Sequence, residues 1–174
     1  MFACGLLLIS ASCKKAKTGI EGLPAVTQEG KQTFGCMVNG VLFLPKGSGF
    51  GGPIKQSNYT PVDGTLLFIL SARRSENDKT LGVNIAADGI ELHTGMTIPL
   101  VAPGKGAASG TYTDYATPEF KDYRTNNQIT GELKITRFDF ANQIVSGTFW
   151  FDAVDENGQK VEVREGRFDM RFTK

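Results

Sequence analysis

The feature that most constrains the fold of this chain is an alternation of apolar and polar side chains over residues 129–172. Alternation with a period of two residues is the pattern of β-strands that bury one face. It recurs in four runs, at residues 131–137, 146–153, 160–164 and 167–174. The last third of the chain therefore predicts four antiparallel strands joined by three tight connections.

The apolar positions change parity once within this region. Val161 and Val163 are odd-numbered, whereas Phe168 and Met170 are even-numbered. A strand keeps the same side chains on the same face unless an extra residue or a turn intervenes. Gly166 lies where the parity changes and tolerates a positive φ. We therefore expect a bulge or a tight turn at Gly166.

The polar face of the last run carries charges of alternating sign, at Arg167, Asp169 and Arg171. Such a row predicts a strand surface that faces solvent and resists edge-to-edge aggregation.

Phe140 lies in the predicted connection 139–143 and is expected to fold back over the end of the core.

Strand patterns also occur earlier in the chain. Asn39-Gly40 separates two apolar runs and is the preferred sequence for a two-residue type I′ hairpin turn. Residues 46–64 contain five Gly and two Pro, which predicts a long loop. Further strand-like runs occupy residues 65–72, 81–87, 96–100, 110–115 and 121–125.

Together these runs predict about nine to eleven short strands and no helical crossover, so the sheet should be antiparallel. Two packed sheets and a closed barrel are the two arrangements that bury so many one-sided strands. We predict an all-β fold, an antiparallel β-sandwich. A lipocalin-like closed β-barrel is the alternative.

The N-terminus has the form of a lipoprotein signal peptide. Residues 2–9 are an apolar run too short to span a bilayer, and the small residues Ser10, Ala11 and Ser12 follow. Cys13 comes next and resembles the acylated cysteine of a bacterial lipobox, although Ser10 occupies the position where Leu is usual. A lipid on Cys13 would hold the protein at a membrane surface.

The chain therefore divides into three parts. Residues 1–13 are predicted to be the signal peptide, residues 14–32 a flexible tether, and residues 33–174 a single all-β domain. The length of 174 residues suffices for one domain with a hydrophobic core. The formal net charge of +1 provides no field that would attract nucleic acid.

Three phrases of the sequence carry a resemblance to a known family: TFGCMVNG at residues 33–40, IVSGTF at residues 144–149 and GRFD at residues 166–169. After a lipobox-like leader, they resemble a family of Bacteroidota lipoproteins built on a domain of unknown function. The resemblance covers most of residues 30–172. It implies a β-rich domain in the cell envelope and supplies no catalytic residues.

Surface-exported lipoproteins of that group often carry acidic residues after the lipidated cysteine. Lys14 and Lys15 stand there in this chain. The resemblance therefore implies an outer-membrane anchor that faces the periplasm.

The sequence contains no motif of a serine hydrolase, zinc protease or phosphate-binding loop. His93 is the only histidine, and Glu91 shares its face if both lie on a strand. Of the three cysteines, Cys4 and Cys13 lie in the leader, and Cys36 has the pattern of a small buried hydrophobe. We predict no catalytic residue, no cofactor and no metal site.

Four aromatic residues are the candidate ligand-binding residues: Tyr112, Tyr115, Tyr123 and Trp150. The tyrosines lie in the irregular segment 101–128 beside polar residues, and Trp150 lies on the polar face of its run. Flat rings next to polar groups suit stacking on sugars and bonding to their hydroxyls. The alternative is that these rings cover the core and the sheet edge.

We therefore expect a lipid-anchored cell-envelope domain that is a non-enzymatic binding or scaffolding module for a glycan, a small molecule or a protein. Two alternatives remain open. A carboxylate-based glycoside hydrolase needs two carboxyl groups about 5–9.5 Å apart. A lipocalin-like carrier of an apolar ligand needs a cavity inside the fold.

Overall fold

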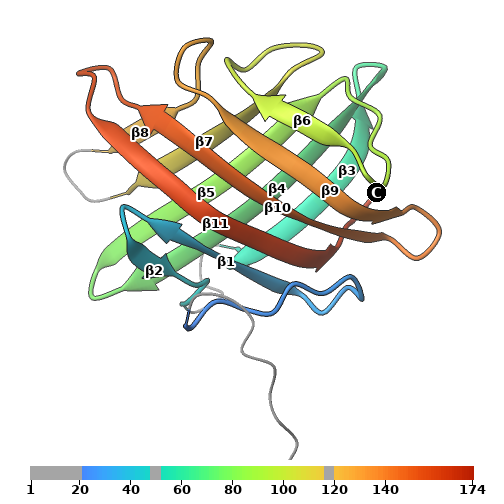
Figure 1. Ribbon diagram of the computed structural model, residues 1–174, viewed down its shortest axis with the longest axis horizontal. Helices are drawn as coiled ribbons and strands as arrows, with labels where there is room; N and C mark the ends of the chain where they lie inside the picture. Colours follow the sequence, from blue (N-terminus) through green and yellow to red (C-terminus); the bar gives the residue numbers. More distant parts are fainter. Residues whose placement is uncertain (1–20, 48–51, 116–119) are drawn as a thin grey trace, which may run out of the picture.

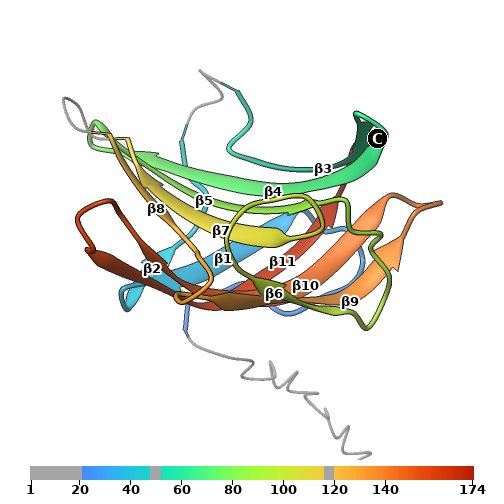
Figure 2. The same ribbon diagram turned by 90° about the horizontal axis from the view of Figure 1, so that it is seen from above.

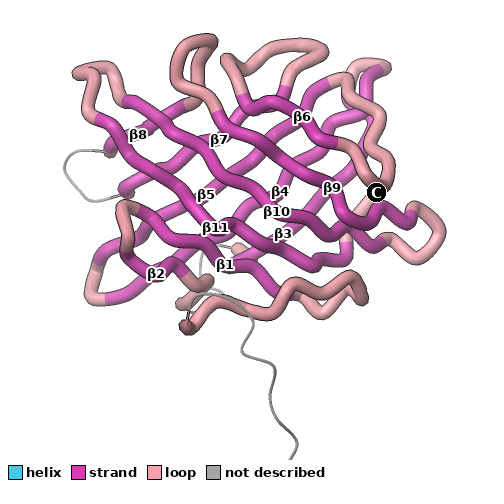
Figure 3. Tube along the Cα trace, viewed as in Figure 1, coloured by secondary structure: helices cyan, strands magenta, loops and turns pink. Residues whose placement is uncertain are grey.

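The computed structural model describes residues 21–47, 52–115 and 120–174, which form eleven strands and no helix (Figure 1). The strands are β1 (Thr33–Val38), β2 (Val41–Phe43), β3 (Lys55–Val62), β4 (Thr65–Glu76), β5 (Lys79–Asp88), β6 (Thr97–Leu100), β7 (Ala108–Asp114), β8 (Lys121–Arg124), β9 (Gly131–Asp139), β10 (Ile144–Val154) and β11 (Lys160–Arg171). Short loops join most of them (Figure 3). The prediction of an all-β fold is confirmed.

The strands form one sheet that folds over into two facing layers. Its order is β2-β1-β11-β10-β9-β6-β7-β5-β4-β3, and β8 pairs with both β7 and β10. Figure 2 shows β3, β4, β5 and β7 in one layer and β1, β11, β10 and β9 in the other. The strands of the two layers run in crossing directions (Figure 1). The arrangement is sandwich-like, as predicted.

The sheet is mixed rather than purely antiparallel. β6 pairs antiparallel with β9, but Leu100 of β6 pairs in parallel with Ala108 of β7. The expectation of an antiparallel sheet is therefore wrong at this point. β6 lies where the sheet passes from one layer to the other, and its two neighbours, β9 and β7, run in opposite directions there.

The core lies between the two layers. Inward side chains of β4, β5, β9, β10 and β11 fill it, including Phe68, Leu70, Val83, Ile85, Leu133, Ile135, Phe151, Val163 and Met170, all of them fully buried. These are the apolar positions of the alternating runs, so the pattern in the sequence and the burial in the structure agree.

The last third forms three strands, not four, because β11 runs through the predicted break as one strand. The parity change is real and is made by a bulge. Phe149 pairs with Gly166 and Phe151 pairs with Val163, so two residues of β11 oppose Trp150 alone. Glu165 carries the positive φ of 53°, whereas a Cβ at Gly166 would lie 2.5 Å from the ring of Phe149.

The prediction of a long loop at residues 46–64 is wrong for the second half of that segment. Residues Lys55–Val62 form β3, an edge strand that pairs with β4. Asp63 and Gly64 then form a two-residue turn with φ values of 47° and 77°. The Asn39-Gly40 turn is confirmed, with φ values of 48° and 77° that fit type I′.

Residues 21–32, which we call the N-terminal strap, lie against the outer faces of β1 and β11. Leu23 is buried, and a Cβ at Gly35 of β1 would lie 2.7 Å from Cδ of Pro24. The strap covers Asp169 of β11, and both Asp169 and Arg167 are buried. The prediction of a solvated charged face is therefore wrong for these two residues. The strap is the later part of the predicted tether.

The carboxylate of Asp169 holds the strap. Its Oδ1 accepts hydrogen bonds from the Gly30 amide at 2.6 Å and the Ser146 hydroxyl at 2.8 Å. Its Oδ2 accepts bonds from the Thr27 hydroxyl at 2.6 Å and from the amides of Glu29 and Lys31 at 3.0 and 3.2 Å. Burial by itself would raise the pKa of Asp169, but these donors offset it and lower the pKa to about 2.

Asp169→Asn is expected to lower the free energy of unfolding at pH 7 by about 2–3 kcal/mol. Both carboxylate oxygens of Asp169 accept at least two hydrogen bonds. In the Asn variant one of these oxygens is replaced by an NH₂ group, which then faces hydrogen-bond donors in either orientation of the side-chain amide. Because the folded pKa lies below the unfolded value, this stabilisation is present above about pH 4 and is lost as the pH falls toward 2. Denaturant unfolding between pH 7 and pH 2 measures both effects.

Asp63→Asn is the matched control, because Asp63 is exposed in a turn that also suits Asn. Its stability should equal that of the wild type at every pH. Equal acid sensitivity of the wild type and Asp169→Asn between pH 4 and pH 2 would contradict the role given to Asp169.

Candidate functional site

The structure separates the four aromatic residues that the sequence singles out. Tyr112 and Tyr123 pair across β7 and β8, with ring centroids 5.8 Å apart, and each is only 8% exposed. Burial raises the pKa of Tyr112 to about 12, and the nearby carboxylate of Asp114 contributes. These two tyrosines belong to the core and offer no ring face to a ligand.

Tyr115 follows the end of β7 and is 43% exposed. Its ring packs edge-on against exposed Phe120, with centroids 5.5 Å apart, and lies over Gly82 of β5. It does not line the hollow that contains Trp150. Tyr115 and Trp150 therefore do not form one stacking surface.

Trp150 lies on the outer face of β10, beside the bulge of β11, and is 41% exposed. The guanidinium carbon of Arg164, one of the two bulge residues, lies 5.5 Å from the ring centroid. A guanidinium at this distance from an indole is held by a cation–π interaction. The bulge thus brings Arg164 and Trp150 together.

A hollow of about 490 Å³ opens around Trp150, and we call it the Trp150 hollow. It draws on β9, β10, β11 and the N-terminal strap. Its lining residues are Val26, Glu132, Thr148, Phe149, Trp150, Arg164, Glu165, Gly166 and Arg167. The volume lies within the range of small-molecule sites, about 300–1,000 Å³.

The guanidinium group of Arg164 is held in place beside Trp150. Arg164 donates to Asp152 Oδ1 at 2.6 Å and to the carbonyl oxygens of Phe151 and Val163 at 3.1 and 3.0 Å. Burial alone would raise the pKa of Asp152, but hydrogen bonds from Lys160 and Arg164 lower it, so it stays ionised.

The second guanidinium, that of Arg167, contacts Glu165 Oε2 at 3.1 Å and is largely buried. Glu132 is half-buried and lies directly opposite Trp150 in the β9–β10 pairing. The hollow therefore presents one exposed aromatic ring, that of Trp150, since Phe149 is buried, together with two fixed guanidinium groups and two carboxylates. This arrangement suits a polar ligand with one flat face.

Sequence reasoning identified Trp150 but not its neighbours. Arg164, Glu132 and Thr148 come from three strands, and their proximity depends on strand order and register. The parity change near Gly166 was the one signal in the sequence, because bulges often lie beside functional sites.

Cys36 and His93 are the other reactive residues in the described part of the chain, and they lie apart from the Trp150 hollow. Cys36 is fully buried, and burial raises the pKa of its thiol, as expected for a structural cysteine. His93 is exposed in the loop before β6 and not on a strand. In the parts of the chain that the structure describes, no three His, Cys, Asp or Glu side chains are grouped to hold a metal ion.

The predicted lipidation residue, Cys13, lies outside the described residues. Among residues 21–47, 52–115 and 120–174, no helix is long and apolar enough to cross a membrane.

Comparison with known proteins identifies a family and no function. No curated protein and no solved structure matches this chain. A family model matches residues 58–170, from within β3 to the last but one residue of β11, and omits the strap, β1 and β2. The matched part covers more than half of the chain and includes most of the Trp150 hollow. The chain belongs to the family described as a domain of unknown function, DUF6252.

Proposed function

We propose that this protein is a lipid-anchored cell-envelope domain that binds a glycan in the Trp150 hollow. The observation that carries the proposal is an exposed indole beside the fixed guanidinium of Arg164 and other polar side chains, in a hollow of about 490 Å³. An aromatic ring offers a flat apolar surface to the C–H face of a sugar, and neighbouring polar side chains bond its hydroxyls.

The lining residues suit this task. Glu132 and Glu165 can accept hydrogen bonds from sugar hydroxyls, and the hydroxyl of Thr148 can donate or accept. Arg164 is already bonded to Asp152, so little side-chain freedom is lost when a ligand arrives. A small molecule with the same polar rim would fit the same features.

The proposed anchor follows from the leader and from the resemblance to Bacteroidota lipoproteins. Cys13 would carry the lipid, and Lys14 and Lys15 favour a periplasm-facing position at the outer membrane. Eight residue steps separate Cys13 from the start of the strap at residue 21. At about 3.6 Å per residue, these span at most about 29 Å, so the domain would stay close to the membrane.

A carboxylate-based glycoside hydrolase is the second candidate, because Glu132 and Glu165 line the same hollow. They lie on β9 and β11, with β10 between them. Strands two positions apart in a sheet are about 10 Å apart. This distance is close to the separation of the two carboxyl groups in inverting glycoside hydrolases and too long for retaining ones. Glu165 forms an ion pair with Arg167, with Oε2 3.1 Å from the guanidinium.

The lipocalin-like carrier gains no comparable support. Such a carrier holds its apolar ligand inside the fold. In the described part of this chain, Phe68, Leu70 and Phe151 fill the space between the layers and are fully buried.

Trp150→Ala is expected to abolish retention on immobilised peptidoglycan and neutral polysaccharides, because the stacking surface is lost. Trp150→Phe should restore part of it. Affinity electrophoresis and column retention measure the effect. Tyr115→Ala is the matched control, since Tyr115 is equally exposed but lies outside the hollow. Unchanged retention of Trp150→Ala, or no retention of the wild type on any glycan, would refute glycan binding and favour a protein partner.

The same glycans distinguish a binding module from a hydrolase. We expect the wild type to bind them without releasing reducing ends. If reducing ends appear, Glu132→Gln and Glu165→Gln should each lower the rate by at least about 100-fold, since each removes one of the two carboxyl groups that the reaction needs. Release that persists in both variants would exclude this pair as catalytic residues.

Cys13→Ser is expected to move the protein from the membrane fraction to the soluble fraction of the producing cells. Removal of the thiol removes the site of acylation. Cys4→Ser, in the same leader, should leave the protein in the membrane fraction. Immunoblots of the two fractions test the anchor, and membrane association of Cys13→Ser would refute it.

A further inference from the structure

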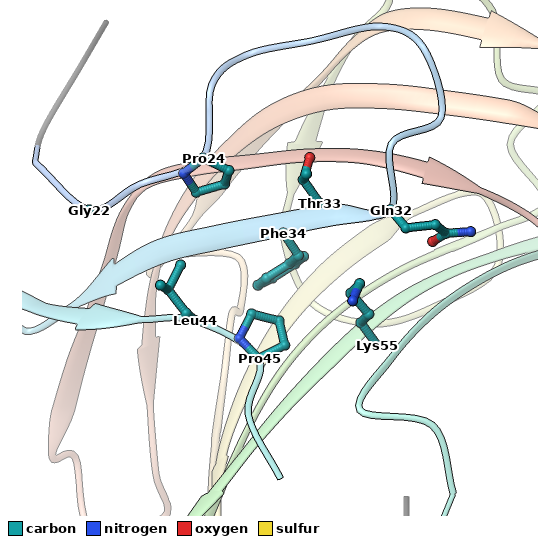
Figure 4. A pocket seen from close by; sticks show the side chains of 8 residues that line it. All are labelled: Gly22, Pro24, Gln32, Thr33, Phe34, Leu44, Pro45 and Lys55. Atoms are coloured by element: carbon teal, nitrogen blue, oxygen red, sulfur yellow. The ribbon is translucent and has the colours of Figure 1, made fainter. Parts of the chain in front are cut away.

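A second hollow opens at the seam where the edges of the two layers meet (Figure 4). Its volume is about 270 Å³. The strap, β1, the segment after β2 and the start of β3 line it. The residues that matter are Pro24, Gln32, Phe34, Leu44, Pro45 and Lys55. We call it the seam hollow, and it shares no lining residue with the Trp150 hollow.

One side of the seam hollow is apolar and rigid. Phe34 belongs to the core, with its ring centroid 5.5 Å from that of Phe149 and 6.3 Å from that of Phe43. Pro24 and Leu44 both pack over Gly35, where an added Cβ would lie 2.7 and 3.0 Å from them. These contacts fix the walls before any ligand arrives.

The other side of the seam hollow is polar. Figure 4 shows Gln32 and Lys55 on one side of the hollow, opposite Pro24 and Leu44, with Phe34 between. Lys55 is half-buried, and within the described residues its ammonium group forms no ion pair, as is also the case for Lys105, Lys121 and Lys134. What distinguishes Lys55 is its place in the seam hollow, where its positive charge next to an apolar wall attracts an anion with an apolar tail.

Gln32 lies beside Lys55 at the mouth of the hollow (Figure 4). Its side-chain amide carries two N–H groups, which can turn to donate to an anion that Lys55 attracts. The backbone of Gln32 has a φ of 58°, in the left-handed region that glycine occupies most readily.

We propose that the seam hollow binds a small carboxylate with a short apolar tail. The carboxylate lies between Lys55 and Gln32, and the tail lies against Phe34 and Leu44. A volume of about 270 Å³ is below that of sites for drug-sized ligands, about 300 Å³ and above, so a tail of a few carbons fits best. This site does not depend on the function proposed for the Trp150 hollow.

Hexanoate, hexanol and acetate are the probes, titrated into ¹⁵N-labelled full chain carrying Cys13→Ser. Hexanoate should produce saturable shifts in the amides of Gln32, Phe34 and Lys55. Hexanol lacks the charge and acetate lacks the tail, so each should bind at least about tenfold more weakly.

Two variants test the polar side. Lys55→Gln should weaken hexanoate binding at least about tenfold, and Lys121→Gln on β8 should leave it unchanged. Gln32→Gly relieves the backbone strain and keeps the fold, yet should weaken binding because it removes the amide. The proposal is overturned if wild type shows no saturable shifts at the hollow, if hexanol binds as tightly as hexanoate, or if Lys55→Gln binds like Lys121→Gln.

Discussion

The buried carboxylate of Asp169 is the interaction on which the outer architecture of this protein depends. A charge without solvent is strongly unfavourable unless it is hydrogen-bonded. Asp169 meets that condition with five donors, four from the N-terminal strap and one from Ser146. The strap is therefore fixed against β11, although it lacks strand pairing of its own.

Both hollows depend on the position of the strap. Val26 forms part of the wall of the Trp150 hollow, and Pro24 forms part of the wall of the seam hollow. The strap is also the described segment nearest in sequence to the proposed lipid anchor. A single buried carboxylate thus connects the segment that leads to the anchor with the two places where we propose that ligands bind.

The bulge in β11 is the second organising feature. Two residues of β11 oppose Trp150, so the strand shifts its inward side chains from Val163 to Phe168 without leaving the sheet. The sequence indicates the bulge clearly, because the apolar residues of a strand change from odd to even positions only where a residue is added. The same bulge places Arg164 beside Trp150. By contrast, the sequence did not predict β3. This edge strand has Ser57 and Asn58 at its centre and lacks the regular apolar face by which a strand is identified.

The strands that bury one face, the Asn39-Gly40 turn and the parity change can be predicted from the sequence, because each depends on neighbours only a few residues apart. Which polar faces are covered and which aromatic rings are exposed depends on contacts between strands that are distant in the sequence. Asp169 looks solvent-facing in the sequence but is buried by the strap. The sequence leaves Tyr123 open between a ligand-binding and a core residue, and in the structure it is buried beside Tyr112. Burial on the second face of a strand depends on what packs there from distant parts of the chain, and alternation along the strand does not contain that information.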